Sequence, residues 1–154
     1  MQTFDYTFTV SAPLNKVRDF HRDTTSLKRL NPPPIIVQLH RVDPMGEGSI
    51  SEFTLWMGPL PVRWHAVHSQ VGDDGFTDIQ EDGPMAIWHH SHRFEAIDDH
   101  STQLYEHIDF QHHPGLRGLP SRLLFNQLAL KVLFTYRKWA TRRALMNSNQ
   151  IIYK

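Results

Sequence analysis

The chain has 154 residues, the length of one compact domain whose core can form without disulfides or metal ions. Sixteen basic residues balance sixteen acidic ones, which argues against a protein that binds nucleic acid or a membrane surface, since such proteins carry excess positive charge. The absence of cysteine excludes disulfides, thiolate metal sites and a cysteine nucleophile. No signal peptide is visible at the N-terminus, so we expect a soluble cytoplasmic protein.

The first thirty residues predict one strand and two short helices. Residues 4–10 alternate with a period of two and are rich in β-forming residues, which is typical of a strand. A helix starts at residues 11–13, where a serine precedes an early proline, and runs to about Arg22. A second short helix ends at Leu30, before three consecutive prolines.

The middle of the chain predicts an antiparallel meander. Short turn segments, most of them with glycine or proline, separate consecutive extended runs, and such short links join antiparallel neighbours. The six runs cover residues 35–42, 49–57, 62–71, 76–81, 86–97 and 102–110.

The last predicted element is a long helix from about Ser121 to Met146. Leu124, Leu128 and Val132 recur at helical spacing, and further apolar residues widen this stripe. Polar residues interrupt the apolar run, which argues against a membrane span.

These elements predict an α+β fold over residues 1–146, followed by a tail at residues 147–154. A seven-stranded sheet must cover its apolar face, and the C-terminal helix is the only element long and apolar enough to do so. A curved sheet wrapped around a helix leaves a cavity between them, and such cavities are common ligand sites.

Two of the eleven histidines are predicted to lie on the inner face of this sheet. Side chains alternate between the faces of a strand, so Trp88, His90, His92 and Phe94 share one face, which their apolar members identify as the inner one. The same spacing places Leu104, Glu106, Ile108 and Phe110 on the inner face of the next strand.

The hairpin register predicts a polar cluster on this inner face. If the chain turns at residues 98–100, His92 lies opposite or nearly opposite Glu106, and His90 lies one inward position further along. Asp78 belongs to the same inner surface, one strand away. Two imidazoles and one or two carboxylates therefore meet inside an apolar cavity.

Three interpretations of this cluster stay open. A buried histidine bonded to Glu106 or Asp78 could simply stabilise the sheet. Alternatively, His90, His92 or Glu106 could hold the polar head group of an apolar ligand. The cluster could also do chemistry, as a metal site or a general acid–base pair. We predict no metal and no cofactor, because His89 points away and no third histidine completes the H-x-H pattern.

Other residues have predicted places around the cavity. His68 is expected at its rim, and Trp139 in the core or the cavity wall. The basic residues 137, 138, 142 and 143 are interpreted as a solvent-exposed helix face. The predicted lining residues are Trp56, Trp64, Trp88, Phe94, Leu124 and Leu128, with His90, His92 and Glu106 as polar contacts.

The order of elements resembles the helix-grip fold of START, polyketide cyclase and pollen-allergen-like proteins, the SRPBCC superfamily. Within it, FTDIQ at residues 76–80, GP at 83–84 and WHHSHRF at 88–94 are similar to the F-x-D-x-Q…G-P-F-x-x-W-x-H-x-H-x-F signature of a bacterial subgroup. Two departures are mild: Met85 stands where the subgroup usually has Phe, and Glu106 where it usually has Asp.

The predicted function is the binding of a hydrophobic small molecule, such as a lipid, quinone, isoprenoid or polyketide-like compound. One alternative is a cyclase or dehydratase that uses a histidine with Glu106 or Asp78 for proton transfer, with His90, His92, Glu106 and Asp78 as candidate catalytic residues. Another is an interaction domain whose own side chains fill the cavity. No nucleic-acid partner is expected, and the sequence is compatible with a homodimer.

Overall fold

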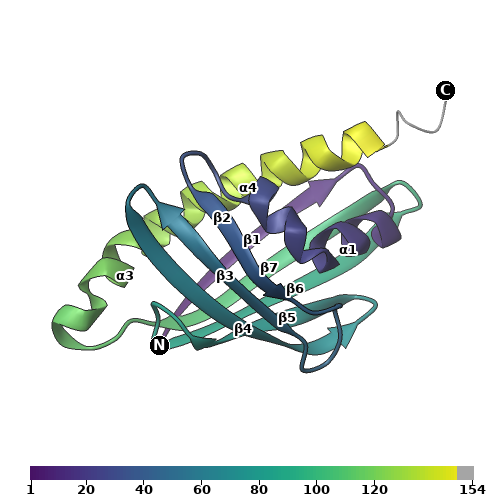
Figure 1. Cartoon of the computed structure of the whole chain (residues 1–154). Helices are drawn as coiled ribbons and strands as arrows, with labels where there is room; N and C mark the ends of the chain where they lie inside the picture. Colours follow the sequence, from purple (N-terminus) through teal and green to yellow (C-terminus); the bar gives the residue numbers. More distant parts are fainter. Residues whose placement is uncertain (149–154) are drawn as a thin grey trace.

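The computed structural model describes residues 1–148, which form a curved seven-stranded antiparallel sheet and a set of helices on one side of it (Figure 1). The predicted strand and all six predicted extended runs are present, with ends that differ by a few residues. The strands are β1 (Gln2–Val10), β2 (Ile36–Val42), β3 (Ile50–Met57), β4 (Leu60–Gly72), β5 (Gly75–Asp82), β6 (Ile87–Asp98) and β7 (Ser101–Gln111).

The first strand forms one edge of the sheet and pairs with the last strand. The strand order is β1-β7-β6-β5-β4-β3-β2, so β2 to β7 form the predicted meander and β1 pairs with β7. The chain therefore has to cross from one edge of the sheet to the other between β1 and β2. It does so through α1 (Leu14–Arg22), the 3-10 turn η1 (Thr24–Ser26) and α2 (Leu27–Leu30), with α1 against β6 and β7 and α2 against β2 and the last helix.

The long helix α4 (Gln127–Ser148) lies along the sheet and supplies much of the core (Figure 1). Leu130 and Phe134 are almost fully buried and belong to one core cluster with Phe4 and Ile108. Leu145 is buried in a second cluster at the far end of the helix. Each side chain of this size stabilises the fold by about 1.5–3 kcal/mol when fully buried.

The prediction of one continuous helix from Ser121 is wrong. The chain forms a short helix α3 (Leu119–Leu124), breaks at Phe125 and restarts as α4. Asn126 explains the break, because its side chain forms hydrogen bonds with the end of α3 and with the start of α4. Its Oδ1 accepts a hydrogen bond of 2.9 Å from the Ala129 amide, and its Nδ2 donates to the carbonyl oxygens of Arg122 and Leu123.

The side of α4 that packs on the sheet also differs from the predicted stripe. Leu128, Val132 and Trp139 are 72, 60 and 51% exposed, so Trp139 is neither core nor cavity lining. Apolar residues occupy nearly every side of this helix, so their spacing alone did not identify the buried face. No helix within residues 1–148 is long and apolar enough to span a membrane. Of the predicted tail, residues 147 and 148 extend α4, and residues 149–154 lie outside the described part.

The contact between β5 and β6 depends on a glycine next to the polar cluster. Gly75 pairs with Arg93 in the register, and a side chain at Gly75 would clash with the backbone carbonyl of His92. Only glycine therefore lets the two strands approach closely where His92 is positioned.

Candidate functional site

A cavity of about 520 Å³ lies between the inner face of the sheet and the helices. Most of its wall is apolar. The sheet contributes Trp64 and Trp88, whose rings meet edge to face with centroids 5.3 Å apart. The helix break turns Phe125 inward onto both tryptophans, with centroid distances of 5.8 and 5.9 Å. The volume is in the range of sites that enclose drug-sized organic molecules.

The cavity opens beside the start of α4. Leu128 and Val132 line it and are nevertheless largely exposed, so this part of the wall is also in contact with solvent.

The opposite end of the cavity is polar, and its residues stand where strand alternation and register predict. His92 pairs with Glu106 and His90 with Ile108 across β6 and β7, while Asp78 of β5 pairs with His90. His90 and His92 line the cavity together with Asp78, and Glu106 is buried behind them.

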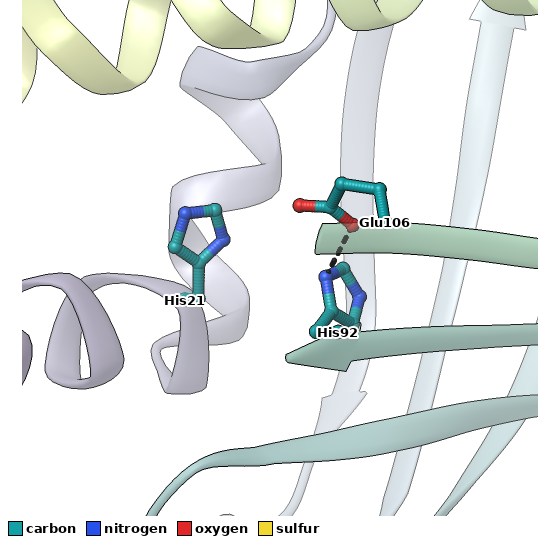
Figure 2. A group of neighbouring side chains, drawn as sticks. All are labelled: His21, His92 and Glu106. Atoms are coloured by element: carbon teal, nitrogen blue, oxygen red, sulfur yellow. Dashed lines mark ion pairs between the residues drawn. The ribbon is translucent and has the colours of Figure 1, made fainter. Parts of the chain in front are cut away.

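Two hydrogen bonds and one ion pair join these four residues into one network. Because a carboxylate can only accept, His90 donates from Nε2 to Glu106 Oε2 over 2.8 Å, and His92 donates from Nε2 to Asp78 Oδ2 over 3.2 Å. The other ring nitrogen of His92, Nδ1, lies 2.7 Å from Glu106 Oε2 (Figure 2). His92 is therefore held between two carboxylates.

Burial lowers the pKa of both histidines, but neighbouring charges shift the two pKa values in opposite directions. Burial lowers the pKa of His90, and the positive charge of His92 lowers it further, to about 4, so His90 is neutral. Burial also lowers the pKa of His92, but the charges and hydrogen bonds of Glu106 and Asp78 outweigh it and raise this pKa to about 9. His92 is thus a buried imidazolium at neutral pH.

The carboxylates are ionised rather than protonated. Burial raises the pKa of Glu106, but the charge of His92 outweighs this effect and holds it well below the ordinary value. For Asp78, burial again raises the pKa, and hydrogen bonds from His68 and His92 outweigh it. A carboxyl group with a pKa near neutrality, which a carboxylic proton donor would need, is therefore not present in this cluster.

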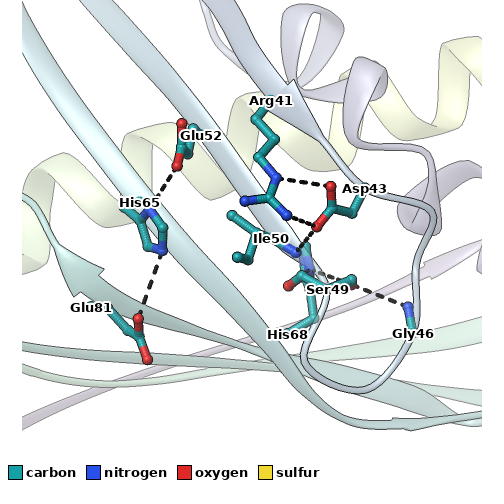
Figure 3. Close-up of polar contacts among 9 residues, drawn as sticks. All are labelled: Arg41, Asp43, Gly46, Ser49, Ile50, Glu52, His65, His68 and Glu81. Atoms are coloured by element: carbon teal, nitrogen blue, oxygen red, sulfur yellow. Dashed lines mark hydrogen bonds and ion pairs between the residues drawn. The ribbon is translucent and has the colours of Figure 1, made fainter.

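His68 extends the network and does not stand at a rim. Only 4% of it is exposed, and its Nε2 lies 3.1 Å from Asp78 Oδ1. Its Nδ1 lies 2.9 Å from the carbonyl oxygen of Ser49 and 3.0 Å from its hydroxyl, in the loop between β2 and β3 (Figure 3). Burial lowers the pKa of His68, but the hydrogen bond with Asp78 outweighs it, so the pKa is raised.

Among the cavity residues that sequence reasoning missed are His21 and Arg137, both of which come from helices. His21 lies four residues after the buried Val17 on α1, and Arg137 three residues after the buried Phe134 on α4. Helical spacing places each of them on an inward face, and this signal could have identified them. The prediction that Arg137 belongs to a solvent-exposed basic face is wrong.

Arg137 brings a positive charge to the polar end. Its Nε donates to the carbonyl oxygen of Leu30 over 3.3 Å, and its guanidinium carbon lies 5.0 Å from the centre of the Phe134 ring. Burial lowers its pKa, although an arginine stays charged at neutral pH. Within residues 1–148, no carboxylate forms an ion pair with it.

Neither a protein-family model nor a curated protein matches this sequence, so comparison rests on structure. The chain is similar to the Zhui aromatase/cyclase from a Streptomyces species, with 19% identity, a TM-score of 0.66 and coverage of 97% of this chain and 93% of that one. A START superfamily protein from Mycobacterium smegmatis is 11% identical, with a TM-score of 0.71 over 94 and 97% of the two chains. Ara h 8.0201 is 14% identical, with a TM-score of 0.69 over 95 and 98%.

The protein has a helix-grip fold, which it shares with these structures. The cavity occupies the space between the sheet and the gripped helix.

Within this helix-grip fold, two residues expected to line the cavity do not do so. Trp56 lies on the opposite face of β3 from Leu55 and Met57, and its indole N–H donates to Gln38 Oε1 over 2.9 Å. Phe94 is 2% exposed and packs in the second core cluster, beyond the end of the cavity. The remaining predicted apolar residues, Trp64, Trp88, Leu124 and Leu128, do line it.

The outer face of the sheet carries a separate polar group. His65 of β4 lies 3.1 Å from Glu52 and 3.7 Å from Glu81, all three on the side away from the cavity (Figure 3). Because it is far more exposed than the inner network, it provides a natural control for experiments on the cavity histidines.

Proposed function

We propose that the protein binds a hydrophobic small molecule, such as a lipid, quinone, isoprenoid or polyketide-like compound, in the cavity between the sheet and α4. The observation that carries the proposal is the 520 Å³ cavity with its largely apolar wall. A space of this size in the core forfeits packing energy unless a ligand occupies it. The cavity also counts against the alternative in which the chain's own side chains fill this space.

The polar end favours a ligand with an acidic head group. Arg137 has a full positive charge and no ion-pair partner within the described chain, and neutral His90 stands at the same end. A carboxylate or similar anion beside Arg137 would supply the missing partner. An apolar tail would then extend past Trp64 and Trp88 toward the opening beside Leu128.

The test is a titration with lauric acid and with lauryl alcohol, followed by tryptophan fluorescence and by the melting temperature. We expect both probes to alter the fluorescence of the cavity tryptophans and to raise the melting temperature. A ligand that binds only the folded state stabilises it by about 2.7 kcal/mol at a hundredfold excess over Kd. No change with either probe would contradict the proposal.

Two variants locate the binding. Ala129 lines the cavity from α4, so Ala129→Trp should fill it and abolish the response, whereas Lys131→Trp adds the same ring to an exposed position of the same helix and should not. Arg137→Gln should weaken binding of the acid more than binding of the alcohol. Its matched control is Arg142→Gln, because Arg142 is exposed and bonds to the backbone of Thr9.

A second candidate function is proton-transfer catalysis of the cyclase or dehydratase kind. It is favoured by one observation, the contact of a protonated and a neutral imidazole in the cavity wall. The rings of His92 and His90 have centroids 3.9 Å apart, so an acid and a base stand side by side. In this version Glu106 and Asp78 hold His92 in its protonated form and transfer no proton themselves.

The two candidates differ in the response of one variant. If His92 serves as a proton donor, His92→Gln abolishes turnover of a carbonyl substrate and leaves lauric acid binding nearly unchanged. If His92 only anchors a ligand, the same variant weakens turnover and lauric acid binding together.

A further inference from the structure

His21, His92 and Glu106 come from three different elements, α1, β6 and β7, and meet at the polar end of the cavity (Figure 2). One ligand atom from each of the three residues lies within 4.8 Å of the other two. Figure 2 shows His21 projecting from its helix toward the pair formed by the strand residues. The chain positions of these residues are far apart, so only the folded sheet and α1 bring them together.

The short contact between His92 and Glu106 has an unusual geometry. His92 Nδ1 lies 2.7 Å from Glu106 Oε2, yet this buried nitrogen forms no hydrogen bond, because the ring is not aligned with the carboxylate oxygen. Two atoms that bind one metal ion in neighbouring positions, at 2.0–2.2 Å each, are about 3 Å apart and point at the ion rather than at each other. The 2.7 Å between His92 Nδ1 and Glu106 Oε2 is close to that separation.

His21 directs its ring to the same place, with Nδ1, the nitrogen next to Cγ, on the side that faces the pair (Figure 2). Its Nε2 is buried and forms no hydrogen bond within the described chain. The ring is held in position by Phe20 and Phe94, with centroid distances of 5.3 Å to each. One ion bound between the three residues would give the unpartnered His92 Nδ1 a partner.

We propose that His21, His92 and Glu106 form a binding site for a first-row divalent transition-metal ion. Two imidazoles and one carboxylate suit ions such as Zn²⁺, Fe²⁺ and Co²⁺. Three protein ligands leave at least one coordination position for a ligand or water from the cavity. The site is independent of the proposed binding of an apolar ligand, which requires only the cavity.

The surrounding residues orient the three ligands as in known metal sites. Asp78 accepts a hydrogen bond from His92 Nε2, which fixes the ring and leaves Nδ1 for the ion. His92 is protonated in the metal-free protein, so the ion would displace the Nδ1 proton on binding. His90 donates to Glu106, and His68 holds Asp78 from the other side. The charges of Asp78 and Glu106 offset that of a divalent ion, while Arg137 contributes an opposing positive charge at longer range.

The test uses the whole chain after removal of bound metal with EDTA. We expect calorimetric titration with Zn²⁺ to show one ion bound per chain, and Co²⁺ to give the visible absorption of a low-symmetry nitrogen and oxygen site. Zn²⁺ should also raise the melting temperature, since it binds the folded state. Absence of Zn²⁺ and Co²⁺ binding to the unmodified protein would overturn the proposal.

Variants identify the ligands. His21→Ala should weaken Zn²⁺ binding more than about 100-fold, beyond the effect of losing an outer contact. His65→Ala should leave it unchanged, because His65 belongs to the exposed group on the outer face. Should His21→Ala fold poorly without metal, Glu106→Gln of equal size gives the same test.

A second cluster consists of Asp78, His90 and His92 and shares His92 with the first. A metal ion bound there would make Zn²⁺ binding depend on His90 and not on His21. Retention of Zn²⁺ in His21→Ala together with its loss in His90→Ala would move the ion to that cluster and contradict the assignment made here. Apolar binding is measured separately with lauryl alcohol, so failure of one proposal is distinguishable from failure of the other.

Discussion

His92 is paired with Glu106 across β6 and β7, and its ring also reaches Asp78 on β5. The imidazole is thus clamped between two carboxylates at distances of 2.7 and 3.2 Å. This arrangement keeps a positive charge inside a mostly apolar cavity wall. It also determines the electrostatics of the other histidines, because the charge of His92 helps to keep His90 neutral.

Removing the charge of Glu106 should therefore release the proton of His92. In Glu106→Gln the largest influence that raises the pKa of His92 is lost, so this pKa should fall from about 9 toward or below its ordinary value. Imidazole signals in an NMR titration with EDTA present would measure it. Glu52→Gln, next to the exposed His65, is the control and should leave His92 unchanged. A pKa of His92 that stays near 9 in Glu106→Gln would contradict this account.

The stability of the protein should pass through a maximum near pH 6.5. His90 has a folded-state pKa of about 4, below its unfolded value of 6.5, so its contribution is complete above pH 6.5 and is lost as the pH falls toward 4. His92 has a folded-state pKa of about 9, so its contribution is complete below pH 6.5 and is lost as the pH rises through 9. His21, with a pKa of about 3, reinforces the acid limb.

Denaturant unfolding in EDTA at a series of pH values measures both limbs, each expected to fall by on the order of 1–3 kcal/mol. His90→Gln should flatten the acid limb and His92→Gln the alkaline limb. A free energy of unfolding that keeps rising from pH 6.5 to 9 would contradict the charged state assigned to His92.

Asn126 should contribute more to stability than its half-buried position suggests. Asn126→Ala removes the hydrogen bond to the Ala129 amide at the start of α4 and the two bonds to the end of α3. Loss of such a cap costs about 1–2 kcal/mol, measurable by denaturant unfolding. Lys131→Ala, at an exposed position of the same helix, should change the free energy of unfolding by only a few tenths of the cost of losing the cap. Equal effects of the two substitutions would show that Asn126 does not cap the helices.

Gly75→Ala should destabilise the sheet beside the polar cluster. The added methyl group would clash with the carbonyl oxygen of His92, so β5 and β6 would have to separate there. We expect a loss of about 1–3 kcal/mol, as for other overpacked sites. Gly46→Ala is the matched control, since the nearest atom to its added methyl group would be a Pro44 oxygen at 3.9 Å. A tolerated Gly75→Ala would mean that the strands adjust freely at His92.

The inner face of the sheet was predictable because strand alternation is a strong local rule. A period of two and one short hairpin were enough to place His92 opposite Glu106 and to bring Asp78 to the same surface. Trp56 shows the limit of choosing lining residues by size, because alternation along β3 turns it outward while Leu55 and Met57 face the cavity.

The helical side of the site was harder to predict for a physical reason. Apolar residues occur on nearly every side of α4 itself. Tertiary contacts of Leu130 and Phe134 therefore decide which face packs on the sheet, and periodicity does not. Whether Arg137 and His21 reach the cavity depends on which face of α4 is buried and on how α1 crosses the open face of the sheet. The break at Asn126 did have a local signal, an asparagine at a helix start, which the surrounding apolar run obscured.

The central claim is that the cavity binds a hydrophobic molecule, and the most direct test is the mass of the gently purified protein measured under native and then denaturing conditions. The account predicts an additional mass in the range of one lipid-like compound in the native measurement, lost on denaturation and lost in Ala129→Trp. A native mass of the unmodified chain that equals its denatured mass, together with no response of this chain to lauric acid, would contradict it.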